Sequence, residues 1–354
     1  MAIAAALLIA ASPVAAAEFS PELQKVIDGA KKEGKLLVST SATILNAAEG
    51  AKAATAGMNK MFGTNIDVTW SVGQTPAQIG GKLLAEMQAN QPAFTDLIVG
   101  TPTQFSPLIK AGLFRVVDWP KLWPDRIKPQ FVEGNGTAFR LYMSVPAILY
   151  NRSEEDRVAK IASLEDFLKP EWKGKFYTTN QFSSLDVLIL DDHWGEKKTT
   201  DFAKSFAKQA LGLIECGAGQ RIAAGEIPVF VIDCGGSEAY MRRYNGVIRY
   251  KVLQEFAQIR YFYIAVPKNA EHPNAAILYA LWWHTPEAQE YHWRERAADN
   301  IDYPESQRRK LILEPLEAQG FKFLNITQEW WDAQKGLTEA NRRVVKALND
   351  AATQ

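Results

Sequence analysis

Two adjacent glycines, Gly235 and Gly236, follow the apolar segment IPVFVID, which has the composition of a buried strand. Glycine exposes its backbone N–H group and lets a ligand approach the chain closely. Successive N–H groups at a turn form a concave surface that suits an anion, and the helix start at 217–219 offers the same chemistry. We predict that this turn binds an oxygen-rich organic anion, such as a carboxylate, phosphonate or phosphate ester. The competing interpretation is an ordinary glycine turn.

Small and hydroxyl-bearing residues also end the other predicted strands. Because the carboxyl ends of parallel strands meet at one edge of a sheet, we expect these residues to contact the ligand. Trp70 and Tyr142 would supply apolar walls, and Asp233 would either bind an ammonium group or cap the next helix. Serine and glycine are equally common in plain turns. The remaining predicted ligand-binding residues are Ser39, Thr40, Ser41, Gly100, Thr101, Thr178 and Thr179.

Two tyrosines offer a different chemistry. Tyr261 and Tyr263 alternate along one predicted strand, so both side chains should lie on the same face. Phenolate oxygens there would bind Fe(III), whereas the plainer interpretation is two packed aromatic rings. Arg221 and Arg242 are candidates for binding a carboxylate, although both lie on predicted helices, where arginine is ordinarily exposed.

Signs of catalysis are few. Ser205 and Lys208 match the S-x-x-K motif of acyl enzymes, but the chain has no S-D-N or K-T-G partner motif. His284 and His292 are eight residues apart on a predicted helix, which is too far for one metal site. We therefore predict no enzyme activity, no metal and no cofactor, and keep a periplasmic hydrolase as an alternative.

The elements that position these residues alternate between strands and helices. SPELQKVIDGAKKEG predicts a helix with Ser20 as N-cap and Gly34 after its last turn, and KLLVSTSA predicts the strand that follows. Two more strand–helix units come next, which indicates a parallel sheet covered by helices on both faces. After TAFRLYMSVPAILYN a second alternating set begins, with helices predicted over 183–192 and 199–210 and a returning strand in RYKVLQEFAQIRYFYIAVP.

Length and charge limit the class of protein. A chain of 354 residues suggests two domains, and 40 basic against 40 acidic residues, with no basic run, argue against nucleic acid as a partner. Residues 1–17 resemble a cleaved signal peptide that ends in an alanine-rich site, although the usual basic start is missing. This leader predicts a periplasmic protein, and we expect a monomer.

Cys216 and Cys234 are the only two cysteines. In an oxidising compartment they would form a disulfide, and the alternative is two buried thiols.

Several segments together resemble the periplasmic solute-binding proteins of ABC importers, in the branch of ferric-ion and aminoethylphosphonate binders. They are KKEGKLLVSTSA, LIKAGLFR, YMSVPAILYN, SLEDFLKPEWKGK, RIAAGEIPVFV and VPKNAEHPNAAILYALWWHTPEAQ. Where ferric-ion members end a strand in two tyrosines, this sequence has Gly235 and Gly236, which departs from the iron pattern.

The resemblance implies a type II two-lobe α/β fold with two crossing hinge strands, a small-molecule ligand in the cleft, and delivery to an ABC permease in the inner membrane. We expect one lobe at 18–137 and 262–354 and the other at 138–261. The hinge strands would lie near 138–151 and 250–265, and the C-terminal helices would also contact the second lobe.

Overall fold

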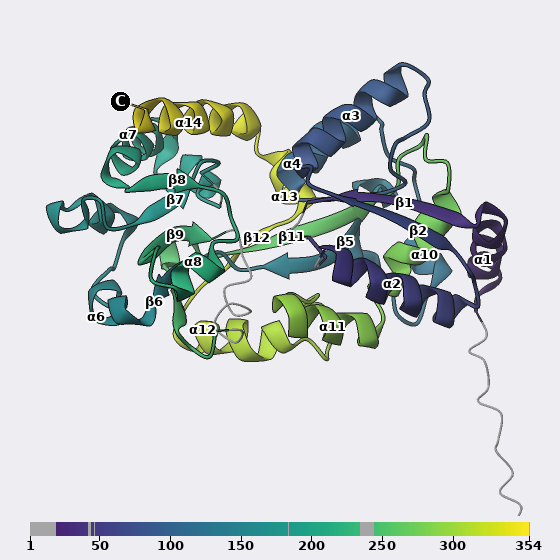
Figure 1. The fold of residues 1–354 in the computed structure, drawn as a ribbon. Coiled ribbons are helices and arrows are strands. Elements are labelled where there is room, and N and C mark those ends of the chain that lie inside the picture. Colours follow the sequence, from purple (N-terminus) through teal and green to yellow (C-terminus); the bar gives the residue numbers. More distant parts are fainter. Residues whose placement is uncertain (1–18, 42–43, 46, 183, 234–243, 354) are drawn as a thin grey trace, which may run out of the picture.

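The computed structural model describes residues 19–41, 44–45, 47–182, 184–233 and 244–353. The chain has the predicted mixed α/β architecture, and its described residues form a two-stranded sheet and two five-stranded sheets, with strands that pass between two parts of the molecule (Figure 1). We call the part around β1 lobe 1 and the part around β9 lobe 2. Among the described residues, no helix is sufficiently long and apolar to span a membrane.

The sheet of lobe 1 mixes parallel and antiparallel neighbours. β1 is parallel to β2, and a single parallel bridge between Val38 and Leu97 joins it to β3. β11 lies antiparallel to both β3 and β5, and it is parallel to β12. The strands are β1 (Lys35–Thr40), β2 (Asp67–Val72), β3 (Ile98–Gly100), β4 (Val132–Glu133), β5 (Ala138–Ser144), β11 (Gln258–Ala265) and β12 (Leu324–Ile326).

Helices cover both faces of this sheet, with α3 and α4 on one side of β1 and β2 and with α2 and α10 on the other (Figure 1). The first helix confirms its predicted caps, since Ser20 Oγ accepts a hydrogen bond from Leu23 N at 3.1 Å and Gly34 adopts φ 65°. The helices are α1 (Pro21–Glu33), α2 (Ala47–Phe62), α3 (Pro76–Gln88), α4 (Pro102–Lys110), α5 (Trp119–Leu122), α10 (Pro273–Trp282) and α11 (Pro286–Arg296).

Lobe 2 has its own five-stranded sheet in the order β10-β6-β9-β7-β8. β5 leads into β6 through Pro146, so these two strands carry the chain from lobe 1 to lobe 2. The strands are β6 (Ala147–Asn151), β7 (Tyr177–Thr179), β8 (Gly212–Ile214), β9 (Val229–Asp233) and β10 (Ile248–Lys251), and the helices are α6 (Glu155–Val158), α7 (Gly195–Gln209) and α8 (Gly219–Ala223).

The helix predicted over 183–192 is wrong for the described residues. Only Asp186–Ile189 forms a short 3₁₀ turn, and all four of its side chains are buried. Val187 and Ile189 are β-branched, which lowers their helix propensity.

The C-terminal part of the chain contacts both lobes. α13 (Gln328–Ala333) packs against α4 in lobe 1, and α14 (Leu337–Ala352) packs against α7 in lobe 2. A short α12 (Glu314–Ala318) precedes them. Three residues, 334–336, separate α13 from α14.

Candidate functional site

Strand direction determines which edges of the two sheets face each other. In lobe 1, β5 runs toward lobe 2, and β3 is parallel to it because both are antiparallel to β11. β1 and β2 run the same way. In lobe 2, β9 is antiparallel to β6 and therefore runs back toward lobe 1, with β7 and β8 parallel to it. The carboxyl ends of both parallel sets thus point at the opposite lobe, which is where open α/β sheets bind ligands.

The end of β1 carries two of the predicted hydroxyls, and both are buried. Ser39 Oγ lies 3.0 Å from Ser71 Oγ, and the Ser39 N–H donates to Thr95 Oγ1 at 2.9 Å. Thr40 is only 2% exposed, yet its Oγ1 has no hydrogen-bond partner within the described part of the chain. Ser41 follows directly and is half-buried.

The ends of β2 and β3 carry the next predicted residues. Trp70 packs its ring 6.5 Å from that of Tyr279, while its buried Nε1 lacks a partner among the described residues. Gly100 ends β3 opposite Tyr263. Thr101 begins α4, where its N–H donates to Gln104 Oε1 at 2.8 Å. Thr101 is therefore already used by the helix start.

On the facing edge of lobe 2, Thr178 and Thr179 are buried in β7, and Asp233 ends β9 at 1% exposure. Asp233 pairs with Ala147, directly after the crossing from lobe 1. Gly235, Gly236 and Arg242 lie outside the described residues. Cys216, near the end of β8, is disulfide-bonded, while Cys234, the other cysteine of the chain, is also outside the described residues.

Sequence reasoning missed three side chains at these edges. Ser144 is the last residue of β5, is buried, and has an Oγ without a partner among the described residues. Gln74, just after β2, and Asn180, just after β7, are half-buried residues whose side-chain oxygens, Oε1 and Oδ1, are buried and also lack a partner among the described residues. All three residues lie at or shortly after strand ends, and this position in the sequence could have identified them as candidate ligand-binding residues.

Tyr142 lies apart from these unpaired groups. Its ring stacks on Phe262 at 4.5 Å between centroids and meets His292 edge-on at 4.6 Å. Burial raises the pKa of its phenol above the ordinary value. Tyr142 is thus packed core, so its role as a ligand wall remains only a prediction.

A family model described as bacterial extracellular solute-binding protein matches residues 53–298, more than half of the chain. The chain belongs to this family. The match confirms the resemblance to the solute-binding proteins of ABC importers, and the branch within that group stays a prediction. No curated protein sequence matches the chain significantly.

Solved structures give the same fold at low sequence identity. The substrate-binding protein of an ABC transporter from Agrobacterium tumefaciens has a TM-score of 0.69 at 14% identity, covering 92% of this chain and 97% of its own. Iron-bound HitA from Pseudomonas aeruginosa has a TM-score of 0.68 at 16% identity, with 90% and 99% coverage. The spermidine/putrescine substrate-binding protein PotD from Streptococcus pneumoniae has a TM-score of 0.61 at 14% identity, with 88% and 99% coverage.

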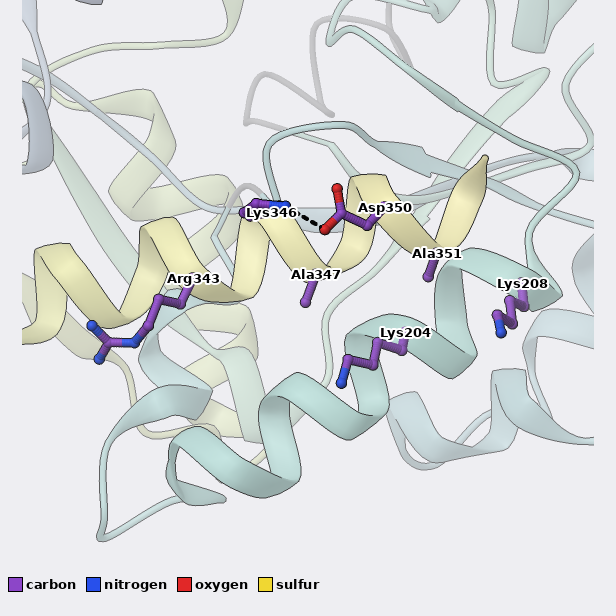
Figure 2. A pocket seen from close by; sticks show the side chains of 7 residues that line it. All are labelled: Lys204, Lys208, Arg343, Lys346, Ala347, Asp350 and Ala351. Atoms are coloured by element: carbon purple, nitrogen blue, oxygen red, sulfur yellow. Dashed lines mark hydrogen bonds and ion pairs between the residues drawn. The ribbon is translucent and has the colours of Figure 1, made fainter. Parts of the chain in front are cut away.

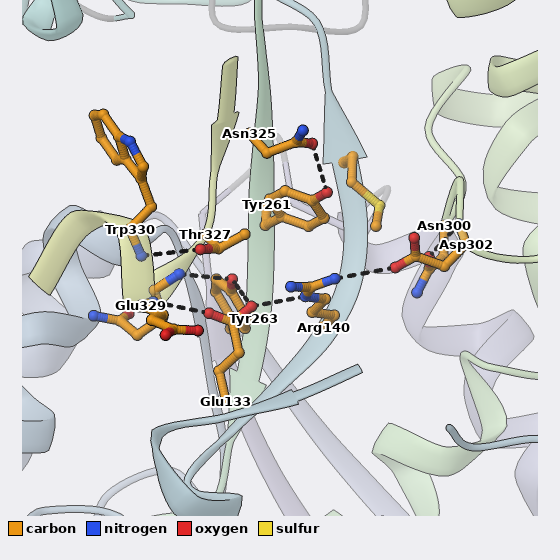
Figure 3. A network of polar contacts seen from close by, with 12 residues as sticks. Glu133, Arg140, Tyr261, Tyr263, Asn300, Asp302, Asn325, Thr327, Glu329 and Trp330 are labelled. Atoms are coloured by element: carbon orange, nitrogen blue, oxygen red, sulfur yellow. Dashed lines mark hydrogen bonds and ion pairs between the residues drawn. The ribbon is translucent and has the colours of Figure 1, made fainter. Parts of the chain in front are cut away.

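In this solute-binding protein the two candidate tyrosines have acceptors of their own (Figure 3). The Tyr261 hydroxyl donates to Asn325 Oδ1 at 2.9 Å, and the Tyr263 hydroxyl donates to Glu133 Oε1 at 2.5 Å. Burial raises the pKa of Tyr261 to about 12 and raises the pKa of Tyr263 well above its usual value. Both phenols are therefore protonated at neutral pH.

The serine of the S-x-x-K motif is part of an ordinary surface helix. Ser205 Oγ in α7 donates to the carbonyl of Asp201 at 3.1 Å. Lys208, from the same motif, lines a pocket of about 430 Å³ between α7 and α14 (Figure 2). Two other cations of that pocket are ion-paired, Arg343 with Glu196 and Lys346 with Asp350.

His284 and His292 do not share one helix as predicted, because α10 ends at Trp282 and α11 begins at Pro286. Burial lowers the pKa of both His284 and His292 to about 3, and the Nδ1 of His284 lies 2.7 Å from the hydroxyl of Tyr303. Within the described ranges, no group of three His, Cys, Asp or Glu residues is placed to hold a metal ion.

Proposed function

We propose that this protein is the periplasmic substrate-binding component of an ABC importer and that it binds a small organic anion between its lobes. The observation that carries the proposal is a set of buried hydrogen-bond donors at or near the facing strand ends that have no partner among the described residues: Thr40 Oγ1, Trp70 Nε1 and Ser144 Oγ. Buried polar groups in native proteins are nearly always paired, so unpaired donors beside a ligand edge call for an acceptor from the ligand.

The chemistry of these groups favours an anion. Indole N–H is only a donor, and a hydroxyl donates readily to a carboxylate or phosphonate oxygen. Hydrogen bonds to a charged oxygen are about twice as strong as neutral ones. The predicted turn at Gly235 and Gly236 would add backbone donors, and Thr178 and Thr179 would contact the ligand from lobe 2. Asp233 would bind an ammonium group of a zwitterionic ligand.

The rest of the function follows from the two-lobe fold. A ligand that contacts both lobes favours their closed arrangement, which a permease in the inner membrane can then recognise. The proposal also includes one lobe at 18–137 and 262–354, the other lobe at 138–261, a signal peptide at 1–17, and a monomeric protein. The C-terminal helix α14 does pack against α7 of lobe 2.

A ferric alternative is considered because the structurally similar HitA is described as iron-bound. In this chain the ferric ligands would be Tyr261 and Tyr263. Both hydroxyls already donate inside the protein, so ferric binding there would need two hydrogen bonds to break. The hydrolase alternative would use Ser205, whose hydroxyl bonds to its own helix. Neither arrangement favours these chemistries over an anion.

A thermal-shift screen tests the proposal. Carboxylates, phosphonates, sugar phosphates, ferric citrate and spermidine are added singly to the purified protein. A ligand at a hundred times its Kd stabilises the native state by about 2.7 kcal/mol, which raises the melting temperature by several degrees. We expect a shift from one of the organic anions, and a shift from ferric ion or spermidine alone would contradict the proposal.

Matched variants locate the site. Ser144→Ala removes an unpaired hydroxyl at a facing strand end and should reduce the shift, whereas Ser205→Ala removes an exposed hydroxyl on α7 and should leave it unchanged. Equal shifts in both variants would place the ligand elsewhere.

A further inference from the structure

The carboxylate of Glu133 joins three separate elements (Figure 3). It accepts hydrogen bonds from Arg140 Nε in β5 at 2.7 Å, from the Tyr263 hydroxyl in β11 at 2.5 Å, and from the backbone N–H of Glu329 in α13 at 3.0 Å. The Tyr263 oxygen in turn accepts from the N–H of Gln328 at 3.0 Å. Glu133 thus ties the first turn of α13 to β5, through which the chain enters lobe 2, and to β11, through which it returns. We call β5 and β11 the crossing strands.

This cluster is largely buried, and one guanidinium is shared by two carboxylates. The side chains of Glu133 and Arg140 are 9% and 13% exposed. Arg140 also pairs with Asp302 at 3.2 Å, and its guanidinium lies 4.4 Å from the centre of the Tyr261 ring. Charge-assisted bonds in a buried setting are the strong ones, so α13 is held firmly on lobe 1.

The far end of α13 is fixed to lobe 1 as well. Asp332 accepts a hydrogen bond from the Ser106 hydroxyl in α4 and forms an ion pair with Lys110 at 3.9 Å. Gln328 Nε2 donates to the same carboxylate at 2.9 Å. Both turns of this short helix therefore move with lobe 1.

The following helix is fixed to lobe 2. In α14, Arg343 forms a two-pronged contact with Glu196 of α7, at 2.7 and 2.9 Å. Asn349 Nδ2 donates to the backbone carbonyl of Asn180 at 2.8 Å, directly after the end of β7. The residues between the helices end in Gly336, whose φ of 77° is left-handed. We call α13, α14 and the residues between them the C-terminal connection.

We propose that Glu133 is a positioning residue for ligand binding: by fixing α13 to the crossing strands, it makes the C-terminal connection restrain the separation of the two lobes. The restraint extends to the candidate site, because the backbone carbonyl of Asn180, which accepts a hydrogen bond from Asn349 of α14, directly follows the end of β7. This inference rests on the proposed function, in which the ligand binds between lobes that close.

The test measures lobe separation without a ligand. Spin labels are attached through Lys32→Cys on α1 and Lys160→Cys after α6, both exposed positions, and the distribution of distances between them is recorded. In Glu133→Gln the amide cannot accept from all three donors, so we expect the distribution to broaden. An insertion of Gly-Ser after Lys335 lengthens the C-terminal connection in an exposed segment, leaves Glu133 intact, and should broaden it too.

Glu305→Gln is the matched control, since the carboxylate of Glu305 pairs with Arg126 in lobe 1 rather than with a residue of α13. It should leave the distances as in the parent protein. Unchanged distributions in both Glu133→Gln and the insertion variant overturn the proposal, and the insertion decides alone if Glu133→Gln does not fold. Because these measurements contain no ligand, they stand apart from the thermal-shift screen, which can fail without affecting them.

Discussion

Two groups of buried polar side chains lie on the sheet of lobe 1, and they differ in how well they are paired. Around Glu133, each hydrogen bond described above has both partners inside the protein. At the facing strand ends, Thr40, Trp70 and Ser144 bury donors without partners in the described part of the chain. The Glu133 group pairs its charged side chains, although the buried Oε1 of Gln328 has no partner among the described residues. Paired charges rigidify a fold, whereas unpaired donors represent a cost that a ligand can remove.

This contrast also bears on the tyrosines. Tyr261 and Tyr263 belong to the paired group, since each hydroxyl has an acceptor. Removing groups from the two regions should therefore have opposite consequences. Variants of the paired group should lose stability, and variants of the unpaired group should lose affinity for the ligand.

The largest expected effect is on the buried charges. Arg140→Met leaves Glu133 and Asp302 without their cation, and breaking a buried ion pair costs about 3–5 kcal/mol of unfolding free energy. Arg343→Met breaks a pair on the surface, with side chains 60% and 41% exposed, and should cost far less because water screens an exposed pair. Denaturant unfolding measures both, and equal losses would mean that the Glu133 cluster is no stronger than a surface pair.

Next in size is the loss of one hydroxyl from the paired group. Tyr263→Phe keeps the ring but leaves the N–H of Gln328 and one oxygen of Glu133 with fewer partners. Unsatisfied buried groups cost about 1–3 kcal/mol each, so the unfolding free energy should fall by that order. A stability equal to that of the parent protein would show that water replaces the hydroxyl.

Alkaline pH should reveal the buried phenol of Tyr261. Its pKa of about 12 exceeds the value near 10 expected in the unfolded chain, because the folded state favours the neutral form. The unfolded chain therefore loses this proton first, and stability falls as pH rises from about 10 to 12, with a slope of up to about 1.4 kcal/mol per pH unit. The difference between the parent protein and Tyr261→Phe isolates the effect, and parallel pH curves would contradict it.

Local patterns predicted part of this molecule well. Ser20 and Gly34 bound the first helix as their residue types indicate, and the strands that end at Thr40, Gly100, Thr179 and Asp233 lie where apolar runs end. The type and order of the elements follow from periodicity and capping, which are properties of neighbours in sequence.

The rest depends on contacts between distant residues. Tyr263 meets Glu133, which precedes it by 130 positions, and no spacing rule connects them. The lack of a partner for Ser144 Oγ and Asn180 Oδ1 among the described residues is likewise a property of the packed chain. The segment at Asp186–Ile189 forms only a 3₁₀ turn instead of the predicted helix, and its Asp186 is paired to the distant Arg260. Tertiary packing there outweighs local preference.

The smallest effect on stability should come from the unpaired group, and two buried threonines of lobe 1 make the comparison close. Thr40→Val removes an unpaired hydroxyl from a buried strand position and preserves the side-chain shape, so the free energy of unfolding should stay the same or rise by up to about 1 kcal/mol. Thr95→Val removes a hydroxyl that accepts from the Ser39 N–H and bonds to two carbonyls, so it should destabilise by about 1–3 kcal/mol. Affinity for the anion found in the screen separates the two further, because only Thr40→Val should weaken binding without loss of stability. If Thr40→Val instead destabilises the protein as much as Thr95→Val does, the Thr40 hydroxyl is paired in solution and the argument for a ligand acceptor at the end of β1 fails.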